Sequence, residues 1–211
     1  MKRILFQGDS ITDAHRLRDN DNFAGNGYPT LLKARIGADY PNEYECIKRG
    51  VSGDRIVDIY ARVRRDVIKL KPDIVSILVG INDVWHEFMN GNGVNAEKYA
   101  LVYKLLLDEI KSELPETKLV ILEPFVLNGT ATCNTGEYPE RYETFRREIK
   151  LRSEAAFDVC QSHGGTFVPL QGVLDAACEK APAGHWLIDG VHPTAAGHEL
   201  IAREWIKTVK L

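Results

Sequence analysis

The sequence lacks the features that would place the protein in a membrane or on nucleic acid. Its 211 residues contain no apolar run near the ~20 residues that a membrane-spanning helix needs. The net charge is only −3, so the composition provides no basic surface for nucleic acid. A predicted strand begins at the N-terminus, which leaves no room for a signal peptide. We therefore expect a cytoplasmic protein without a nucleic-acid or membrane partner.

Cysteine is also scarce, and its spacing excludes two further classes of protein. The four cysteines form neither a CxxC pair nor a Cys/His motif, and they lie at Cys46, Cys133, Cys160 and Cys178. This pattern indicates free thiols in a reducing compartment instead of a disulfide framework or a zinc site. None of them follows a strand and a glycine, so a cysteine nucleophile is disfavoured. We expect no metal and no cofactor.

Short apolar runs alternate with amphipathic segments along the whole chain. The runs predict strands at 4–6, 44–48, 74–79, 119–122 and 166–168. Between and after them, apolar residues at helical spacing predict helices at about 28–36, 56–70, 99–114, 140–162, 173–180 and 194–209, with Asp54 as the N-cap of the second. Such alternation is typical of βαβ units and a parallel sheet. The sequence thus predicts one α/β domain spanning residues 1–211.

Two predicted loops are longer than a compact α/β fold needs. They span about 84–95 and 125–139, and each follows a predicted strand at the same edge of the sheet. Long ordered loops are often functional. In the first of them, Trp85, Phe88 and Met89 are interpreted either as the wall of a substrate pocket or as core residues.

Ser10 is the candidate nucleophile. It follows the strand at 4–6 and the strand-breaking Gly8, so it lies at the carboxyl end of a strand. Ligands of open α/β sheets bind at that edge. The alternative interpretation is that Asp9, Ser10 or Thr12 only caps a helix.

A serine hydroxyl needs a general base, and His192 is the best placed of the six histidines. It ends the turn Asp189-Gly-Val-His192, just before the last predicted helix. Asp189 can accept a hydrogen bond from Nδ1 of His192, which leaves Nε2 free for Ser10. The alternative is that Asp189 or Thr194 caps the helix. The other histidines favour surface, capping or packing roles, and they are His15, His86, His163, His185 and His198.

Acyl transfer also needs hydrogen-bond donors for an oxyanion. Gly53 follows the second predicted strand and can present a backbone N–H at close approach. Asn82 follows the third predicted strand and can present its side-chain amide. Each of them is, alternatively, an ordinary turn residue. All four segments lie at strand ends or before a helix, and together they supply every role that acyl transfer requires.

These four segments resemble the signature blocks of the SGNH/GDSL hydrolase superfamily, in the family's order: Gly8-Asp-Ser-Ile-Thr12, the turn at Gly53, Gly80-Ile-Asn82 and Asp189-Gly-Val-His192. The resemblance implies a three-layer α/β/α sandwich with a flavodoxin-like, five-stranded parallel sheet of order 2-1-3-4-5. It also implies Ser10 as nucleophile, His192 as base and Asp189 as its orienting acid. The oxyanion donors would be the N–H groups of Ser10 and Gly53 and the side chain of Asn82.

Residues 79–86, 123–125 and 193–198 are similar to the branch of intracellular acetyl xylan esterases and related carbohydrate acetylesterases. This implies removal of a short acyl group from a sugar hydroxyl, and a homo-oligomer. Candidate pocket residues are Asp9, Trp85, Phe88 and Ile188. Ile188 stands where some relatives have tryptophan, so we expect different substrate contacts there. Alternatives are a lysophospholipase or thioesterase, an acyl transferase, and a sugar-binding protein without catalysis.

Overall fold

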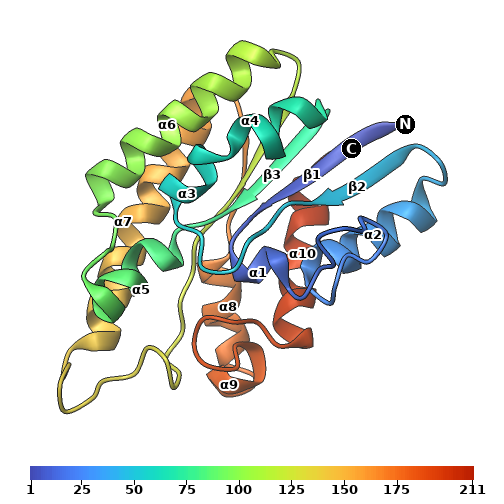
Figure 1. Ribbon diagram of the computed structural model, residues 1–211. Coiled ribbons are helices and arrows are strands. Elements are labelled where there is room, and N and C mark those ends of the chain that lie inside the picture. Colours follow the sequence, from blue (N-terminus) through green and yellow to red (C-terminus); the bar gives the residue numbers. More distant parts are fainter.

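Five parallel strands form the centre of the protein, which a computed structural model describes over residues 1–211 (Figure 1). The strands are β1 (Lys2–Gly8), β2 (Tyr44–Lys48), β3 (Ile74–Leu78), β4 (Lys118–Leu122) and β5 (Thr166–Val168). Their order is β2-β1-β3-β4-β5, and every neighbouring pair is parallel. The predicted fold class and strand order are therefore confirmed.

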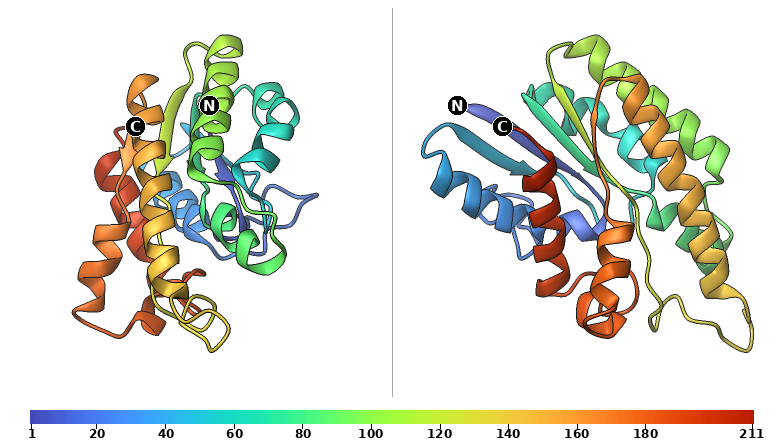
Figure 2. Two further views of the ribbon diagram at one scale, coloured as in Figure 1. Left: turned by 90° about the vertical axis from the view of Figure 1, so that its left-hand side faces the viewer. Right: turned by 180° about the vertical axis from the view of Figure 1, so that it is seen from behind.

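Helices cover both faces of the sheet (Figure 2). One face packs against α2 (Tyr28–Asp39), α8 (Gln171–Cys178) and α10 (Ala195–Thr208). The other face packs against α3 (Ile56–Ala61), α4 (Val63–Asp66) and α6 (Ala96–Glu113). The long helix α7 (Arg141–Ser162) runs beside α6 and contributes residues to both cores. Because both faces are covered, every residue of β3 is buried, as its unbroken apolar run predicts.

Alternate residues of the strands divide the interior into two cores. In β1, Ile4 and Phe6 point to the α2/α10 side, whereas Leu5 points to the α3/α6 side. A polar contact joins the sheet to the last helix, because Trp205 Nε1 donates to Ser76 Oγ at 3.0 Å. No helix in the protein combines the length and the apolar character needed to cross a membrane.

The predicted helix at 56–70 is in fact three short helices, and this part of the prediction is wrong. The chain forms α3, α4 and a 3₁₀ turn, η1 (Ile68–Leu70), with breaks at Arg62 and Val67. The apolar residues still face the sheet, so the periodicity survives the breaks. Asp54 is not the N-cap: α3 begins after Arg55, while Asp54 accepts a hydrogen bond of 2.7 Å from Arg62 Nε. An ion pair with a residue eight positions further along the chain thus replaces the predicted cap.

The predicted loop at 84–95 is also wrong, because helix α5 (Ile81–Asn90) fills most of it. Ile81, Val84, Trp85 and Phe88 follow the spacing of one helical face and pack on the core. The other predicted loop, 125–139, is confirmed, since it contains no helix or strand. Two short helices that the sequence did not reveal complete the fold: α1 (Ser10–Asp13) and α9 (Ala183–Trp186).

Candidate active site

Ser10 stands at the carboxyl end of β1, as the first residue of α1. The preceding turn is possible only because residue 8 is glycine: a Cβ there would lie 2.3 Å from the carbonyl oxygen of Leu78 on β3. The Asp9 side chain then caps α1 by accepting a hydrogen bond of 2.9 Å from the N–H of Ile11. The turn that caps α1 is thus also the turn that places Ser10 at the edge of the sheet.

The fold brings the three residues of the candidate triad together from opposite ends of the chain. Ser10 Oγ lies 3.0 Å from His192 Nε2, and His192 Nδ1 lies 2.7 Å from Asp189 Oδ2. Both distances lie within hydrogen-bond range. The arrangement connects a hydroxyl, an imidazole and a carboxylate in the order that a serine nucleophile requires.

The turn from Asp189 to His192 is held by its own carboxylate. Asp189 Oδ1 accepts hydrogen bonds from the backbone N–H groups of Val191 at 2.9 Å and His192 at 2.8 Å. Partial burial alone would raise the pKa of Asp189, but the bonds from His192 and Val191 outweigh it and lower that pKa to about 2. The hydrogen bond that His192 donates to Asp189 raises the pKa of His192 above its ordinary value. The carboxylate therefore stays ionised and makes the imidazole of His192 more basic.

The long segment 125–139 forms backbone hydrogen bonds to the turn from Asp189 to His192. The N–H of Leu127 donates to the carbonyl of Gly190 at 2.9 Å, and the N–H of Ala131 donates to the carbonyl of Asp189 at 2.9 Å. Gly129 packs so closely that a Cβ there would lie 2.2 Å from the backbone of Asp189. This loop holds the turn from Asp189 to His192 in place and contributes no residue to the lining of the cleft.

The three candidate oxyanion donors have free N–H groups. The backbone N–H groups of Ser10 and Gly53 donate to no protein acceptor. Gly53 has a left-handed φ of +86°, and nothing lies within 4 Å of where its Cβ would be, so its backbone is open to a ligand. Asn82 Nδ2 donates one of its two hydrogens to the carbonyl of Asp54, at 3.1 Å, and its second hydrogen is free.

Hydrogen bonds lock the donor segments to one another. The N–H of Val51 donates to the carbonyl of Gly8 at 3.0 Å, and the N–H of Ser52 donates to Asp13 Oδ2 at 3.1 Å. On the other side, the N–H of Ile56 donates to Asp83 Oδ1 at 3.1 Å, next to Asn82. The turns are thus fixed before any substrate arrives, as preorganised electrostatic stabilisation requires.

Ser10 and His192 open into a cleft of about 550 Å³. Its other lining residues are mostly small or polar: Ile11, Ala14, His15, Asn26, Ser52, Ile188, Asp189, Pro193, Thr194, Ala195 and His198. Ile188 is 66 % exposed. Trp85 does not line the cleft, but the centroid of its ring lies 5.7 Å from that of His192. The cleft provides no deep apolar channel.

Two of the predicted pocket residues lie elsewhere, so these predictions are corrected. Asp9 is fully buried beneath the turn and does not reach the cleft, because its side chain caps α1. Phe88 stacks on Phe145 at 4.9 Å and lines a separate hollow next to Arg152. Met89 is exposed on α5. Trp85 and Ile188 remain as neighbours of the triad.

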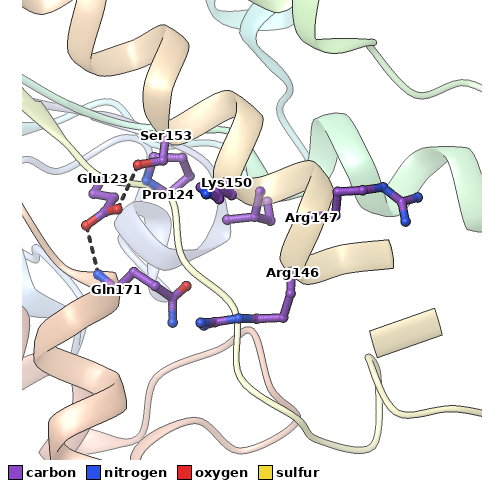
Figure 3. Close-up of a pocket in the computed structure, with 8 residues that line it drawn as sticks. Glu123, Pro124, Arg146, Arg147, Lys150, Ser153 and Gln171 are labelled. Atoms are coloured by element: carbon purple, nitrogen blue, oxygen red, sulfur yellow. Dashed lines mark hydrogen bonds between the residues drawn. The ribbon is translucent and has the colours of Figure 1, made fainter. Parts of the chain in front are cut away.

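A second hollow, of about 420 Å³, contains a serine but no histidine (Figure 3). Ser153 Oγ donates to Glu123 Oε1 at 2.7 Å, and Glu123 Oε2 accepts from the N–H of Gln171 at 2.9 Å. No histidine lines this hollow. Ser153 therefore lacks the imidazole that activates a serine, and the cleft at Ser10 is the better candidate active site.

His15 and His198 also line the cleft, although the sequence favours surface, capping or packing roles for both. Its position in the sequence could have indicated this for His198, because it lies in the first turns of the helix after His192 and so at the same edge of the sheet.

All four cysteines are free. No group of three or more His, Cys, Asp or Glu side chains is arranged to hold a metal ion.

This fold and this site define a class of protein, and similarity to known proteins supports the same class. Residues 6–200 match the GDSL-like lipase/acylhydrolase family model. The chain belongs to this family and is a carboxylic ester hydrolase.

Known proteins resemble the chain over nearly its whole length. An acetylxylan esterase of Geobacillus stearothermophilus is 29 % identical, over 99 % of this chain and 94 % of the relative. The crystal structure of the Geobacillus esterase Axe2 superimposes with a TM-score of 0.85 at 29 % identity, covering 98 % of this chain and 93 % of that one. The crystal structure of a GDSL-like protein from Parabacteroides merdae superimposes with a TM-score of 0.88 at 32 % identity, covering 98 % of this chain and 94 % of that one.

Proposed function

We propose that the protein is a serine esterase that removes an acetyl group from a sugar hydroxyl through an acyl-enzyme on Ser10. The observation that carries this proposal is the chain of contacts from Ser10 Oγ to His192 Nε2, at 3.0 Å, and from His192 Nδ1 to Asp189 Oδ2, at 2.7 Å. A base oriented by a carboxylate and touching a serine hydroxyl is the arrangement that makes serine nucleophilic.

In the first half of the reaction, His192 Nε2 takes the proton of Ser10 while Oγ bonds to the ester carbonyl carbon. The negative charge moves to the carbonyl oxygen. That oxygen accepts hydrogen bonds from the N–H groups of Ser10 and Gly53 and from Asn82 Nδ2. The carbon–oxygen bond to the alcohol then breaks, and the alcohol oxygen leaves with the proton from His192.

In the second half, water replaces the alcohol. His192 Nε2 takes a proton from the water, whose oxygen bonds to the acyl carbon. The same donors hold the oxyanion. The bond between the acyl carbon and Ser10 Oγ breaks, Oγ recovers the proton from His192, and a carboxylic acid leaves. The enzyme returns to its starting state without a metal or a cofactor.

The short acyl group and the sugar are supported by two observations. The similar Geobacillus enzyme is named an acetylxylan esterase. The cleft carries hydrogen-bonding side chains such as Asn26, Ser52 and Thr194, and its apolar lining is limited to Ile11, Ile188 and smaller residues. A long acyl chain needs a larger apolar surface than this.

Hydrolysis of p-nitrophenyl esters from acetyl to octanoyl tests this proposal, with Ser10→Ala beside the wild type and acetylated xylo-oligosaccharides as the next substrate. We expect acetate to be cleaved best and Ser10→Ala to be inactive. Preference for octanoate would contradict the acetyl specificity and favour a lipid or thioester substrate. Full activity of Ser10→Ala would remove Ser10 as the nucleophile.

A further inference from the structure

We infer that His198 is a substrate-binding residue, whose Nε2–H donates a hydrogen bond to an oxygen of the sugar alcohol that the acetyl group esterifies. This inference rests on the proposed function, since it assigns the alcohol side of the same cleft. Three observations carry it: the partner of Nδ1, the environment of the ring, and the position of Nε2.

The Nδ1 atom of His198 is already occupied by a structural contact. It accepts a hydrogen bond of 3.1 Å from the N–H of Tyr28, in the first turn of α2. The N-cap residue of α2 is Gly27, which has no side chain to accept from the free N–H groups there. His198, from α10, thus caps α2 across the interface between the two helices. A nitrogen that accepts a hydrogen bond carries no hydrogen, so the proton of a neutral ring is on Nε2.

The environment of His198 keeps the ring neutral. The residue is 8 % exposed, and its ring stacks beside that of Tyr28 at 6.5 Å. Burial, with smaller contributions from the charges of Lys48 and His192, lowers the pKa of His198 to about 4. Protonation would also break the bond from Tyr28, because Nδ1 would become a donor. His198 is therefore a fixed N–H donor near neutral pH and not a second base.

The Nε2 atom of His198 is free and accessible. No protein group bonds to it, and it is not among the buried side-chain atoms that lack a partner. The residue lines the same cleft as Ser10 and His192, next to Asn26 and Thr194. An acetyl group offers one strong acceptor, its carbonyl oxygen, which the oxyanion donors take. A further N–H in the cleft therefore serves oxygens of the alcohol, such as sugar hydroxyls or a ring oxygen.

Two substitutions test the roles of the two ring nitrogens of His198 separately. In His198→Asn the amide oxygen takes the place of Nδ1, so the cap on Tyr28 is kept and the donor in the cleft is lost. In His198→Gln the amide N–H reaches the place of Nε2, so the donor is kept and the cap is lost. Each variant is the matched control for the other. We measure kcat and KM on an acetylated xylo-oligosaccharide and on p-nitrophenyl acetate, together with Tm.

For His198→Asn we expect KM for the sugar ester to rise about tenfold, the effect of one hydrogen bond, with kcat and Tm close to wild type. The preference for the sugar ester over p-nitrophenyl acetate falls by the same factor, because the nitrophenol lacks sugar hydroxyls. For His198→Gln we expect a lower Tm and a KM near wild type.

An unchanged sugar preference in His198→Asn would overturn the inference and leave His198 as a helix cap. A rise in KM that appears only in His198→Gln, together with the lower Tm, would do the same. Failure of the proposed function looks different. In that case the wild type would not hydrolyse the sugar ester, or Ser10→Ala would keep its activity, whatever residue 198 is.

Discussion

His192 and His198 lie six residues apart and line one cleft, yet the structure gives them opposite properties. Nδ1 of His192 donates to the carboxylate of Asp189, which raises the pKa of the ring. Nδ1 of His198 accepts from the N–H of Tyr28 in a buried setting, and burial lowers its pKa to about 4. The partner of Nδ1 thus decides whether the other nitrogen is a base or a donor.

Removing the imidazole of His192 is expected to have the largest effect of any change to the two histidines. We expect His192→Ala to lower kcat by a factor on the order of 10⁶, because Ser10 then has no proton acceptor. Steady-state hydrolysis of p-nitrophenyl acetate measures the loss. His185→Ala is the matched control, since His185 is exposed on α9, outside the cleft lining, and should keep full activity. Equal activity of the two variants would contradict the assignment of His192.

Removing the charge of Asp189, the partner of His192 Nδ1, is expected to have the next largest effect on activity. Asp189→Asn keeps the shape of the turn but no longer favours the tautomer with the proton on Nδ1, so kcat should fall about 10⁴-fold. The pKa of His192 should fall too, because its largest upward cause is the bond to Asp189. The activity and an NMR titration of His192 are measured together. A normal kcat, or an unmoved pKa, would show that Asp189 does not orient the base.

The oxyanion donors can be removed without touching either histidine. Asn82→Ala should lower kcat by about 10²–10³-fold with little change in KM, because the donor acts on charge that develops in the transition state. Asn128→Ala, at an exposed position, is the control. A variant with a raised KM and a normal kcat would place Asn82 in ground-state binding instead.

The two histidines should also have opposite effects on stability. The folded pKa of His198 is lowered to about 4, so the unfolded chain binds a proton first as pH falls below about 6.5, and stability is lost down to pH 4. This loss amounts to about 2–3 kcal/mol. The raised pKa of His192 acts the other way, since its stabilisation is present below about 6.5 and is lost as pH rises through the folded pKa. Urea unfolding at pH 4 to 8 should show a shallower acid loss in His198→Asn than in the wild type. If the stabilities of the wild type and His198→Asn changed in parallel with pH, the lowered pKa of His198 would be contradicted.

The smallest expected effect is a shift in the pH profile. Activity requires neutral His192, so kcat/KM should fall on the acid side with a midpoint above 6.5, because the pKa of His192 is raised. The groups that act on this titration are Asp189 and the buried Asp9, whose pKa burial raises to about 7. Asp9→Asn keeps the cap on α1 and removes one charge near His192, so its midpoint should be slightly lower. A profile that is flat from pH 5 to 8 would exclude a titrating base.

The sequence was sufficient where the signal was local or repeated. The apolar runs predict all five strands, and Asp189-Gly-Val-His192 predicts a contact made within one turn. It was insufficient where contacts outside the local pattern decide the outcome. Asp54 pairs with Arg62 in place of capping a helix, and a glycine-rich sequence at 91–93 obscured the helical spacing of α5. The role of His198 depends on Tyr28, 170 residues away, which no spacing along the chain reveals.

Covalent labelling with a fluorophosphonate shows whether His192 activates Ser10. Only an activated serine reacts with this probe, and peptide mass spectrometry locates the bond. The account predicts one label, on Ser10, in the wild type and in Ser153→Ala, and no label in Ser10→Ala or His192→Ala. A label on another serine, or equal labelling of Ser10 when His192 is absent, would contradict it.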